Sequence, residues 1–153
     1  MTLNVVVRPI AASDYERWLP LWIAYNEFYG RTGATALPAQ VTAMTWSRFL
    51  DTNEAVRALV AEAQGKIIGF AHYLFHRSTI STTNVCYLQD LFTAEAARGL
   101  GVATALIEAV YTAAEASGAN RVYWQTHETN QVARRLYDKL AERSGFIVYR
   151  KPL

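Results

Sequence analysis

The segment that most constrains this chain is a strand-like run that leads through a glycine-rich loop into a helix. Residues 85–93 (VCYLQDLFT) have the β-branched and aromatic content of a strand, and a helical period of apolar residues begins at Val102. Between them, Gly99, Gly101 and Ala103 carry little or no side chain, so a ligand can approach the backbone. The unbonded N–H groups at the start of such a helix, with the positive end of its dipole behind them, favour an anion such as a diphosphate.

Three phosphate-binding loops can be compared with this segment. A P-loop requires Gly-Lys followed by Ser or Thr, and the segment has no such triplet. A dinucleotide fingerprint requires a small residue where Thr104 stands, and an acidic residue about 20 positions later, where the chain has Arg121. An NAD(P)-linked enzyme stays an alternative on this pattern. The loop that fits is R-x-x-G-x-A, formed by Arg98, Gly101 and Ala103.

The remaining sequence predicts a mixed α/β fold, of α+β character, in a single domain of residues 1–153. The strand–helix–strand unit around the glycine loop favours a right-handed parallel crossover beside antiparallel strands. Ser13 and Glu16 are expected to form a capping box. In order, the predicted elements are a strand at Val5–Val7 ended by Arg8-Pro9, a helix from Ser13 to about Gly30, a helix from Pro38 to about Leu50, hairpin strands 56–62 and 66–76, a strand at 85–93, a helix from near Gly101 to Gly118, a strand at Arg121–Thr126, a helix from Asn130 to about Ala141, and a last strand at Phe146–Arg150.

Length and composition exclude several classes of protein. With 153 residues, 52% of them hydrophobic, the chain can build one core. The net charge of +2 comes from 15 basic and 13 acidic residues without a basic cluster, so nucleic-acid binding is not expected. No apolar run approaches the ~18–20 residues that a bilayer requires, and Met1–Arg8 does not read as a signal segment, so no membrane association is expected. Cys86, the single cysteine, allows no internal disulfide, and we expect a cytoplasmic protein.

No metal site is predicted. His72 and His76 have a spacing that suits a metal ion on a helix, but on a strand four residues span ~13 Å. A solvated or internally hydrogen-bonded role is therefore expected for each. Cys86 lies in an apolar run without a basic neighbour in the sequence, which disfavours a nucleophilic role for its thiol.

Four groups of residues, in order along the chain, resemble one family. They are Tyr87–Phe92 (YLQDLF), Arg98–Ala103 (RGLGVA), Asn130–Lys139 with Ala133, Leu136 and Tyr137 at the matching positions, and Gly145-Phe146. Together they resemble the GNAT superfamily of N-acetyltransferases over residues 85–151, whereas residues before 85 agree only in the order of elements. Residues 127–130 (HETN) and 136–140 (LYDKL) are most similar to the histone and polyamine acetyltransferase branch.

The resemblance implies a GNAT fold: a central, mostly antiparallel sheet flanked by helices, with the parallel strands 85–93 and 121–126 splayed by a β-bulge. Acetyl-coenzyme A, the acetyl donor, would lie in that opening. The backbones of Leu91 and Thr93 would pair with pantetheine, and the N–H of Leu91 would bind the thioester carbonyl, a kind of contact worth ~3–4 kcal/mol. The donor-binding residues implied in this way are Leu91, Phe92, Thr93, Arg98, Gly99, Leu100, Gly101, Val102, Ala103, Thr104, Asn130 and Tyr137.

Aminolysis of a thioester needs a neutral amine, a stabilised oxyanion and a proton for the departing thiolate. Tyr137 is the predicted general acid, because a phenol with a reference pKa of ~10 keeps its proton at neutral pH and because the resemblance places it near the sulfur. Polyamine-acetylating relatives have Glu where this chain has Gln89, and an amide cannot accept the amine's proton. Asp90 is the predicted catalytic carboxylate; the other candidate bases, which stay open, are Glu27, His72, His127, Glu128 and a water relay.

The predicted acceptor is a primary amine, either of a small molecule such as a polyamine or of a protein lysine, acetylated directly in a ternary complex. Candidate pocket residues are Tyr25, Glu27, Tyr29 and Gln89, and loops 30–37 and 77–84 are expected to shape the pocket. A homodimer is expected if the C-terminal strand pairs with, or exchanges into, a second copy, as it does in some relatives. The alternative to an enzyme is a non-catalytic module that binds acyl-coenzyme A.

Overall fold

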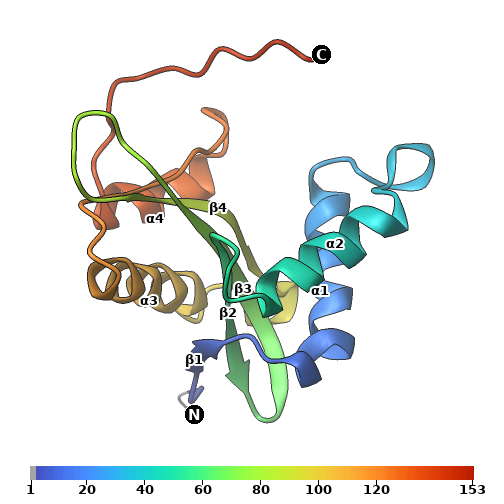
Figure 1. Cartoon of the computed structure of the whole chain (residues 1–153). Coiled ribbons are helices and arrows are strands. Elements are labelled where there is room, and N and C mark those ends of the chain that lie inside the picture. Colours follow the sequence, from blue (N-terminus) through green and yellow to red (C-terminus); the bar gives the residue numbers. More distant parts are fainter. Residues whose placement is uncertain (1–2) are drawn as a thin grey trace.

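The computed structural model describes residues 3–153; the first two residues of the predicted domain and of the N-terminal segment lie outside this range. Its strands form one sheet in the order β1-β2-β3-β4-β5, antiparallel except for the parallel pair β4 and β5 (Figure 1). This confirms the mixed sheet that the sequence predicts. The elements are β1 (Val6–Pro9), α1 (Tyr15–Phe28), α2 (Ala39–Leu50), β2 (Val56–Ala63), β3 (Lys66–His76), β4 (Val85–Thr93), α3 (Val102–Ala116), β5 (Val122–Tyr123) and α4 (Gln131–Leu140).

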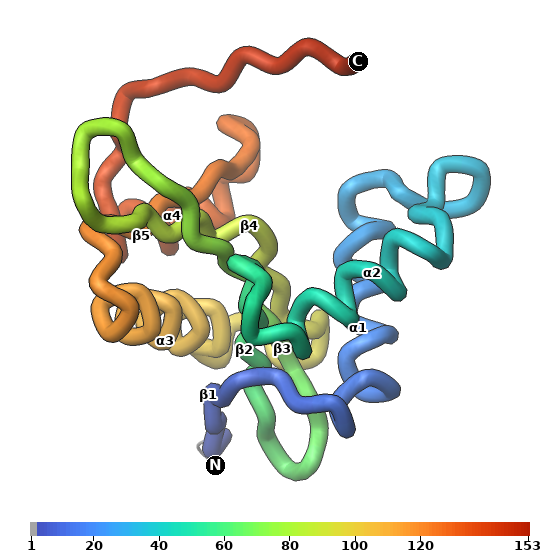
Figure 2. Tube along the Cα trace, in the orientation of Figure 1, coloured from blue at the N-terminus to red at the C-terminus, as the bar shows by residue number. Residues whose placement is uncertain are grey.

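Helices cover both faces of the sheet, with α1 and α2 on one side and α3 on the other (Figure 2). Alternation along β2 explains the two cores, because neighbouring side chains on a strand point to opposite faces. Ala58 and Val60 pack with the aromatic side of α1, whereas Leu59 and Ala61 pack with α3. Gly69 on β3 permits the close approach of α3, since a Cβ there would lie 3.0 Å from a methyl of Val102.

A β-bulge interrupts β4 at Gln89. Asp90 pairs with His72 and Leu88 pairs with Tyr73, so Gln89 is the extra residue that faces no partner on β3. As a result Leu88 and Leu91, three positions apart, both face the α3 core. The bulge thus changes which side chains of β4 point to each face of the sheet.

The end of the chain differs from the prediction in two respects. The strand expected at 121–126 is only two residues long and pairs through Cys86 with Val122 and Tyr87 with Tyr123. The last strand expected at 146–150 is wrong: the segment is extended but unpaired, and it runs away from the body of the molecule (Figure 1). A strand needs a partner as well as strand-forming residues, and Phe146 and Tyr149 remain about nine-tenths exposed, at 92% and 89%.

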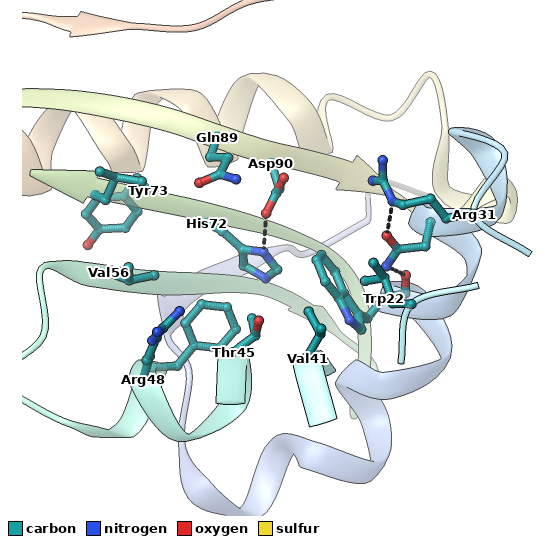
Figure 3. A pocket seen from close by; sticks show the side chains of 14 residues that line it. Trp22, Arg31, Val41, Thr45, Arg48, Val56, His72, Tyr73, Gln89 and Asp90 are labelled. Carbon is teal, nitrogen blue, oxygen red and sulfur yellow. Dashed lines mark hydrogen bonds and ion pairs between the residues drawn. The ribbon is translucent and has the colours of Figure 1, made fainter. Parts of the chain in front are cut away.

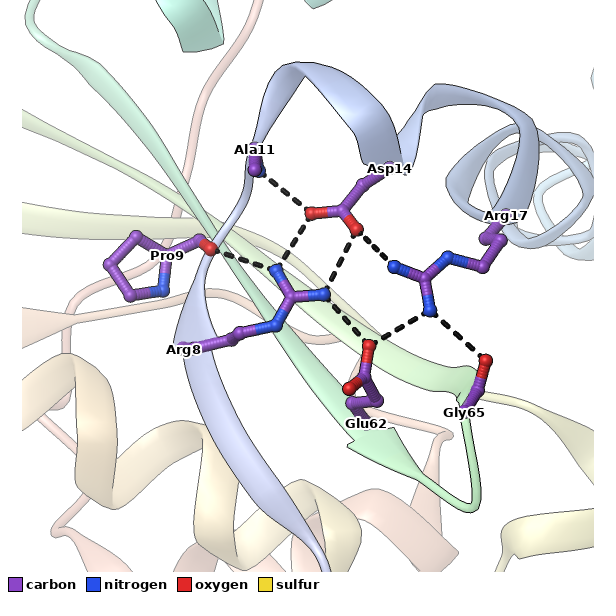
Figure 4. A network of polar contacts seen from close by, with 7 residues as sticks. All are labelled: Arg8, Pro9, Ala11, Asp14, Arg17, Glu62 and Gly65. Atoms are coloured by element: carbon purple, nitrogen blue, oxygen red, sulfur yellow. Dashed lines mark hydrogen bonds and ion pairs between the residues drawn. The ribbon is translucent and has the colours of Figure 1, made fainter.

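The predicted capping box at Ser13 and Glu16 is also wrong. Asp14 takes that role, because its carboxylate accepts a 2.7 Å hydrogen bond from the N–H of Ala11. The fully buried Asp14 also bonds Arg8 at 2.8 Å and Arg17 at 2.6 Å, and both arginines bond Glu62 on β2 (Figure 4). Hydrogen bonds from Arg8 hold the pKa of Asp14 at about 2. This network fixes the start of α1 on the edge of the sheet.

None of the helices among residues 3–153 combines the length and the apolar content needed to cross a membrane.

Candidate active site

Strand β4 is bonded on both sides only near its start, and a gap opens beside its second half. The N–H of Cys86 bonds the carbonyl of Arg121 at 3.0 Å, on the side toward β5, whereas the N–H of Ala94 bonds Ile68 of β3 at 2.8 Å. N–H groups alternate sides along a strand, so the N–H groups of two residues an even number of positions apart point to the same side. The extra residue of the bulge shifts this alternation by one position, so beyond it the N–H groups at an odd number of positions from Cys86 point to the side that Cys86 faces. The N–H groups of Leu91 and Thr93 therefore face the gap that the short β5 leaves.

The glycine loop lies at the end of this gap and begins α3. Gly99 and Gly101 have φ of +77° and +81°, a left-handed conformation that side chains disfavour. No backbone or side-chain acceptor among residues 3–153 bonds the N–H groups from Gly99 to Thr104. Arg98 lies back over the end of β4, with its guanidinium 5.8 Å from the ring of Phe92. The loop thus presents a row of free N–H donors beside a cation, which fits a diphosphate.

Two of the predicted donor-binding residues lie on helix α4 or at its start: Tyr137 and Asn130. Tyr137 packs edge-on against Trp124, which follows β5, at 5.4 Å between ring centroids. Burial raises the pKa of Tyr137 above that of a free phenol, so the hydroxyl keeps its proton at neutral pH. Asn130 caps α4 by accepting a 3.4 Å bond from Ala133, which leaves its amide N–H₂ free among the described residues.

A cavity of about 390 Å³ lies on the opposite face, between α1, α2 and the sheet (Figure 3). Its walls combine aromatic and aliphatic side chains with polar and charged ones in equal number, and Asp90 lies beside the bulge on the β4 side. A hollow in which apolar walls carry convergent polar groups is typical of a small-molecule site. The lining residues are Trp22, Asn26, Arg31, Leu37, Val41, Thr45, Arg48, Phe49, Val56, His72, Tyr73, Leu74, Gln89 and Asp90.

Asp90 belongs to a buried chain of hydrogen bonds. The hydroxyl of Tyr25 donates to Oδ1 of Asp90 at 2.7 Å, and Nδ1 of His72 lies 2.9 Å from Oδ2. The indole N–H of Trp18 lies 3.1 Å from Nε2 of His72. An indole can only donate, so Nε2 is the acceptor and Nδ1 carries the hydrogen that it donates to Asp90. Burial lowers the pKa of His72, in agreement with a neutral ring.

This arrangement decides what His72 can do. Both of its nitrogens are engaged, so the ring has no free lone pair for an acceptor amine, and an internally hydrogen-bonded histidine is what the structure shows. His76 points elsewhere: its Nε2 lies 2.8 Å from the hydroxyl of Tyr123 on β5. Asp90 keeps lone pairs on both oxygens beyond the two bonds that it accepts.

The predicted pocket residues separate into two groups. Gln89 lines the cavity, and the Tyr25 hydroxyl donates a hydrogen bond to Asp90, which lines it. Glu27 and Tyr29 are exposed and do not line the cavity. Of the two loops expected to shape the pocket, 30–37 contributes and 77–84 does not. His127 and Glu128 are exposed in the loop before α4, and the ring of His127 bonds Thr129.

Several cavity residues were not found from the sequence. Asn26, Arg31, Thr45 and Arg48 line the cavity, but each is an ordinary polar residue of a helix or loop. The only sequence signal was the position of Arg31 directly after Gly30, in a loop already expected to shape the pocket. Their convergence on β4 depends on how α1 and α2 pack on the sheet.

A parallel strand pair that parts before a bulge, free N–H donors at the start of the following helix, and a cavity on the other face are the features of an acyl-coenzyme A N-acyltransferase. The sequence agrees: residues 17–141 match the acetyltransferase (GNAT) family, and the chain belongs to that family. It is an acetyl-coenzyme A-dependent N-acetyltransferase. Membership sets aside the NAD(P)-linked alternative.

Two curated proteins are similar along nearly the whole chain. The chain is 38% identical to the D-amino-acid N-acetyltransferase HPA3 of Saccharomyces cerevisiae over 150 residues, covering 97% of this chain and 91% of that protein. It is 32% identical to the uncharacterized N-acetyltransferase YhfO of Bacillus subtilis over 145 residues, covering 94% of each. Among solved structures, the aminoglycoside N-acetyltransferase AAC(6')-Iy in complex with coenzyme A superposes with a TM-score of 0.83 at 18% identity, covering 99% of this chain and 97% of that chain. That last likeness concerns the fold.

Proposed function

We propose that this enzyme acetylates the amino group of a small molecule bound in the cavity beside Asp90. One observation carries the proposal: the bulge at Gln89 shifts the alternation of β4 by one residue, so that Asp90 rather than Leu91 points to the cavity side. Asp90 presents its carboxylate to the cavity, and Leu91 turns its N–H toward the gap beside β4. An amine and a thioester bound on the two sides would meet at this point of the strand.

The proposed reaction assigns a role to each of these groups. The acceptor enters as an ammonium attracted to Asp90 and loses its proton to that carboxylate, directly or through water. The neutral nitrogen then bonds to the thioester carbon while the Leu91 N–H stabilises the oxyanion. The carbon–sulfur bond breaks, the Tyr137 hydroxyl gives its proton to the departing thiolate, and the second proton of the nitrogen returns through water to the Tyr137 oxygen. The products are an N-acetyl amide and coenzyme A.

The charges in the cavity favour an amino acid as the acceptor. Arg31 and Arg48 line it together with a single carboxylate, Asp90, so the cavity carries a net positive charge. A polyamine would be repelled, whereas a carboxylate-bearing amine would be attracted. The relative from Saccharomyces cerevisiae is named for D-amino acids, which supports the same choice. The histone and polyamine branch, predicted from residues 127–130 and 136–140, is the less supported acceptor class.

The experiment is a panel of acceptors assayed by thiol release from acetyl-coenzyme A. The panel contains D- and L-amino acids, their carboxamides, polyamines, an aminoglycoside and a lysine peptide, with product identity checked by mass spectrometry. We expect amino acids to give the highest kcat/KM. A preference for polyamines or the peptide would contradict the acceptor class. Binding of coenzyme A without turnover of any amine would favour the non-catalytic module instead.

We also propose a cytoplasmic homodimer of single-domain subunits. Its support is the C-terminal segment, in which five residues, Phe146, Ile147, Val148, Tyr149 and Leu153, keep large apolar side chains exposed. Exposed apolar segments with strand propensity favour pairing with another chain. The single Cys86, buried and unpaired, agrees with a reducing compartment.

A further inference from the structure

Arg31 lines the proposed acceptor cavity and is held there by a hydrogen bond and two aromatic rings. Its Nε donates a 2.6 Å hydrogen bond to Oδ1 of Asn26, and the amide of Asn26 donates at 2.8 Å to the carbonyl of Trp22. Asn26 is only 5% exposed. The guanidinium lies 5.3 Å from the ring centroid of Tyr29 and 5.9 Å from that of Tyr25. A buried amide and two aromatic rings thus fix the orientation of one cation.

This support leaves the two terminal nitrogens of Arg31 without a partner. No carboxylate among residues 3–153 lies within ion-pair distance of Arg31. By contrast with Arg31, Arg8 and Arg17 each bond two carboxylates. A guanidinium whose Nε is already occupied still offers two parallel N–H donors, the geometry that suits a carboxylate.

Tyr25 connects the guanidinium of Arg31 to Asp90, the proposed amine-binding group. Its hydroxyl donates to Asp90 at 2.7 Å, and its ring lies beneath the guanidinium of Arg31. One side chain therefore sets the separation between an anionic and a cationic group that both line the cavity. In Figure 3 Asp90 and Arg31 lie along the same β4 side of the cavity, whereas Arg48 lies across it, beside Val56.

We propose that Arg31 binds the carboxylate of the acceptor and thereby selects amino acids over other amines. The inference rests on the proposed function, since it assumes that the amine binds at Asp90. A zwitterionic acceptor would place its nitrogen at Asp90 and its carboxylate at Arg31. Asn26 acts through Arg31, as the residue that positions it.

The test compares each amino acid that the enzyme acetylates with the carboxamide of the same amino acid, which keeps the amine and lacks the carboxylate anion. Arg31→Gln should lower kcat/KM for the amino acid roughly 10- to 100-fold, the range for a lost charged hydrogen bond, and change the carboxamide less than about threefold. The loss should fall mainly on KM, because the contact is present before and during the reaction. Comparing variants on both acceptors cancels their different intrinsic reactivity.

Three further variants make the result specific. Arg31→Lys keeps the charge but loses the paired donors, and it should fall between the wild type and Arg31→Gln. Lys66→Gln removes one exposed charge at the β2–β3 hairpin and should leave both acceptors unaffected. Arg48→Gln removes the other cation of the cavity and should discriminate between the two acceptors far less than Arg31→Gln does, because its charge attracts the carboxylate without binding it. The melting temperature of each variant shows whether the fold is retained.

Two results would overturn the assignment. An equal loss on the amino acid and its carboxamide would make Arg31 a structural residue, and a carboxylate-specific loss in Arg48→Gln as large as that in Arg31→Gln would move the site across the cavity. A wild-type enzyme that acetylates amines with no preference for the free carboxylate would also refute it, while leaving the N-acetyltransferase activity intact. A wild type that acetylates no amine would instead refute the proposed function itself.

Discussion

The hydroxyl of Tyr25 donates a 2.7 Å hydrogen bond to Oδ1 of Asp90, which ties helix α1 to strand β4 at its bulge. The two residues are 65 positions apart. Burial raises the pKa of Tyr25, and the neighbouring negative charge of Asp90 adds to the effect, so the phenol stays a donor throughout the physiological range. With His72 donating to Oδ2, the carboxylate is held in one orientation toward the cavity.

Removing the Tyr25 hydroxyl should therefore weaken the binding of the acceptor amine. We expect Tyr25→Phe to raise KM for the amine by about tenfold while KM for acetyl-coenzyme A changes less than about twofold, because a hydrogen bond to a charged group is lost. Steady-state kinetics with each substrate varied in turn measures both. Tyr15→Phe, on the first turn of α1 and outside the cavity, is the matched control. Equal effects on both substrates would show that the bond serves only stability.

Tyr137→Phe tests the proposed proton donor. Loss of a general acid lowers rates by about 10²- to 10⁴-fold, so kcat should fall by at least about 10²-fold with little change in either KM. Tyr111→Phe is the control, because it also removes a buried hydroxyl, one that bonds the carbonyl of Leu140 at 3.0 Å. Full turnover in Tyr137→Phe would exclude the role and leave Tyr137 as a packing residue against Trp124.

Substitutions of two glycines at opposite ends of α3 distinguish an effect on acetyl-coenzyme A binding from an effect on stability. Gly101 and Gly118 have φ of +81° and +77°, and a Cβ at either would meet no atom within 4 Å. Alanine at either position should destabilise the fold by about 1–2 kcal/mol through backbone strain. Only Gly101→Ala should also raise KM for acetyl-coenzyme A, by about fivefold or more, since it displaces the N–H donors of the loop. An equal change in KM from Gly118→Ala would contradict the assigned diphosphate site.

The buried carboxylate of Asp14 predicts how stability changes with pH. Its pKa of about 2 lies below the ordinary value of 3.8, so its contribution is complete above about pH 4 and is lost as the pH falls toward 2. A gap of this size corresponds to about 2 kcal/mol. Asp14→Asn should lower the free energy of unfolding by about 2–4 kcal/mol at pH 7, because Arg8 and Arg17 lose their partner. Urea unfolding should show the difference from wild type narrowing between pH 4 and 2; a constant difference would argue against an ionised Asp14.

The exposed C-terminal segment makes the assembly state testable. Light scattering should give the mass of a dimer for the full chain and of a monomer for the double variant Phe146→Asp, Ile147→Asp. Val132→Asp is the control, because Val132 is 78% exposed on α4 and lies outside the segment. A full chain that is monomeric at micromolar concentration would refute the proposed homodimer.

The sequence was most informative where local chemistry decides the structure. The β2–β3 hairpin follows from two strand-like runs around Gln64 and Gly65, and the loop before α3 follows from glycines that the left-handed conformation requires. One failure was local as well: Asp14, rather than Ser13, caps the first helical turn, because two arginines brought in by β1 and α1 stabilise its carboxylate there.

The candidate acceptor site could not be predicted in this way. The bond between Trp18 and His72 joins residues 54 apart, and Arg31 comes to line the same cavity as Asp90 only through the packing of α1 on the sheet. The final strand failed for a related reason, since 146–150 has the composition of a strand but pairs with no strand among residues 3–153. Contacts of this kind depend on tertiary structure, and no periodicity in the sequence encodes them.

The bulge at Gln89 lies between two parts of the enzyme that differ in how readily they tolerate amino-acid substitutions. In the proposed arrangement the donor meets mainly peptide groups beside β4, which almost any residue supplies, while the acceptor meets side chains contributed largely by α1, α2 and their connecting loop. Substitutions in the N-terminal third can therefore alter the chosen amine and leave the shared coenzyme chemistry untouched. A lineage built on this scaffold could diversify its substrates without inventing a new catalyst.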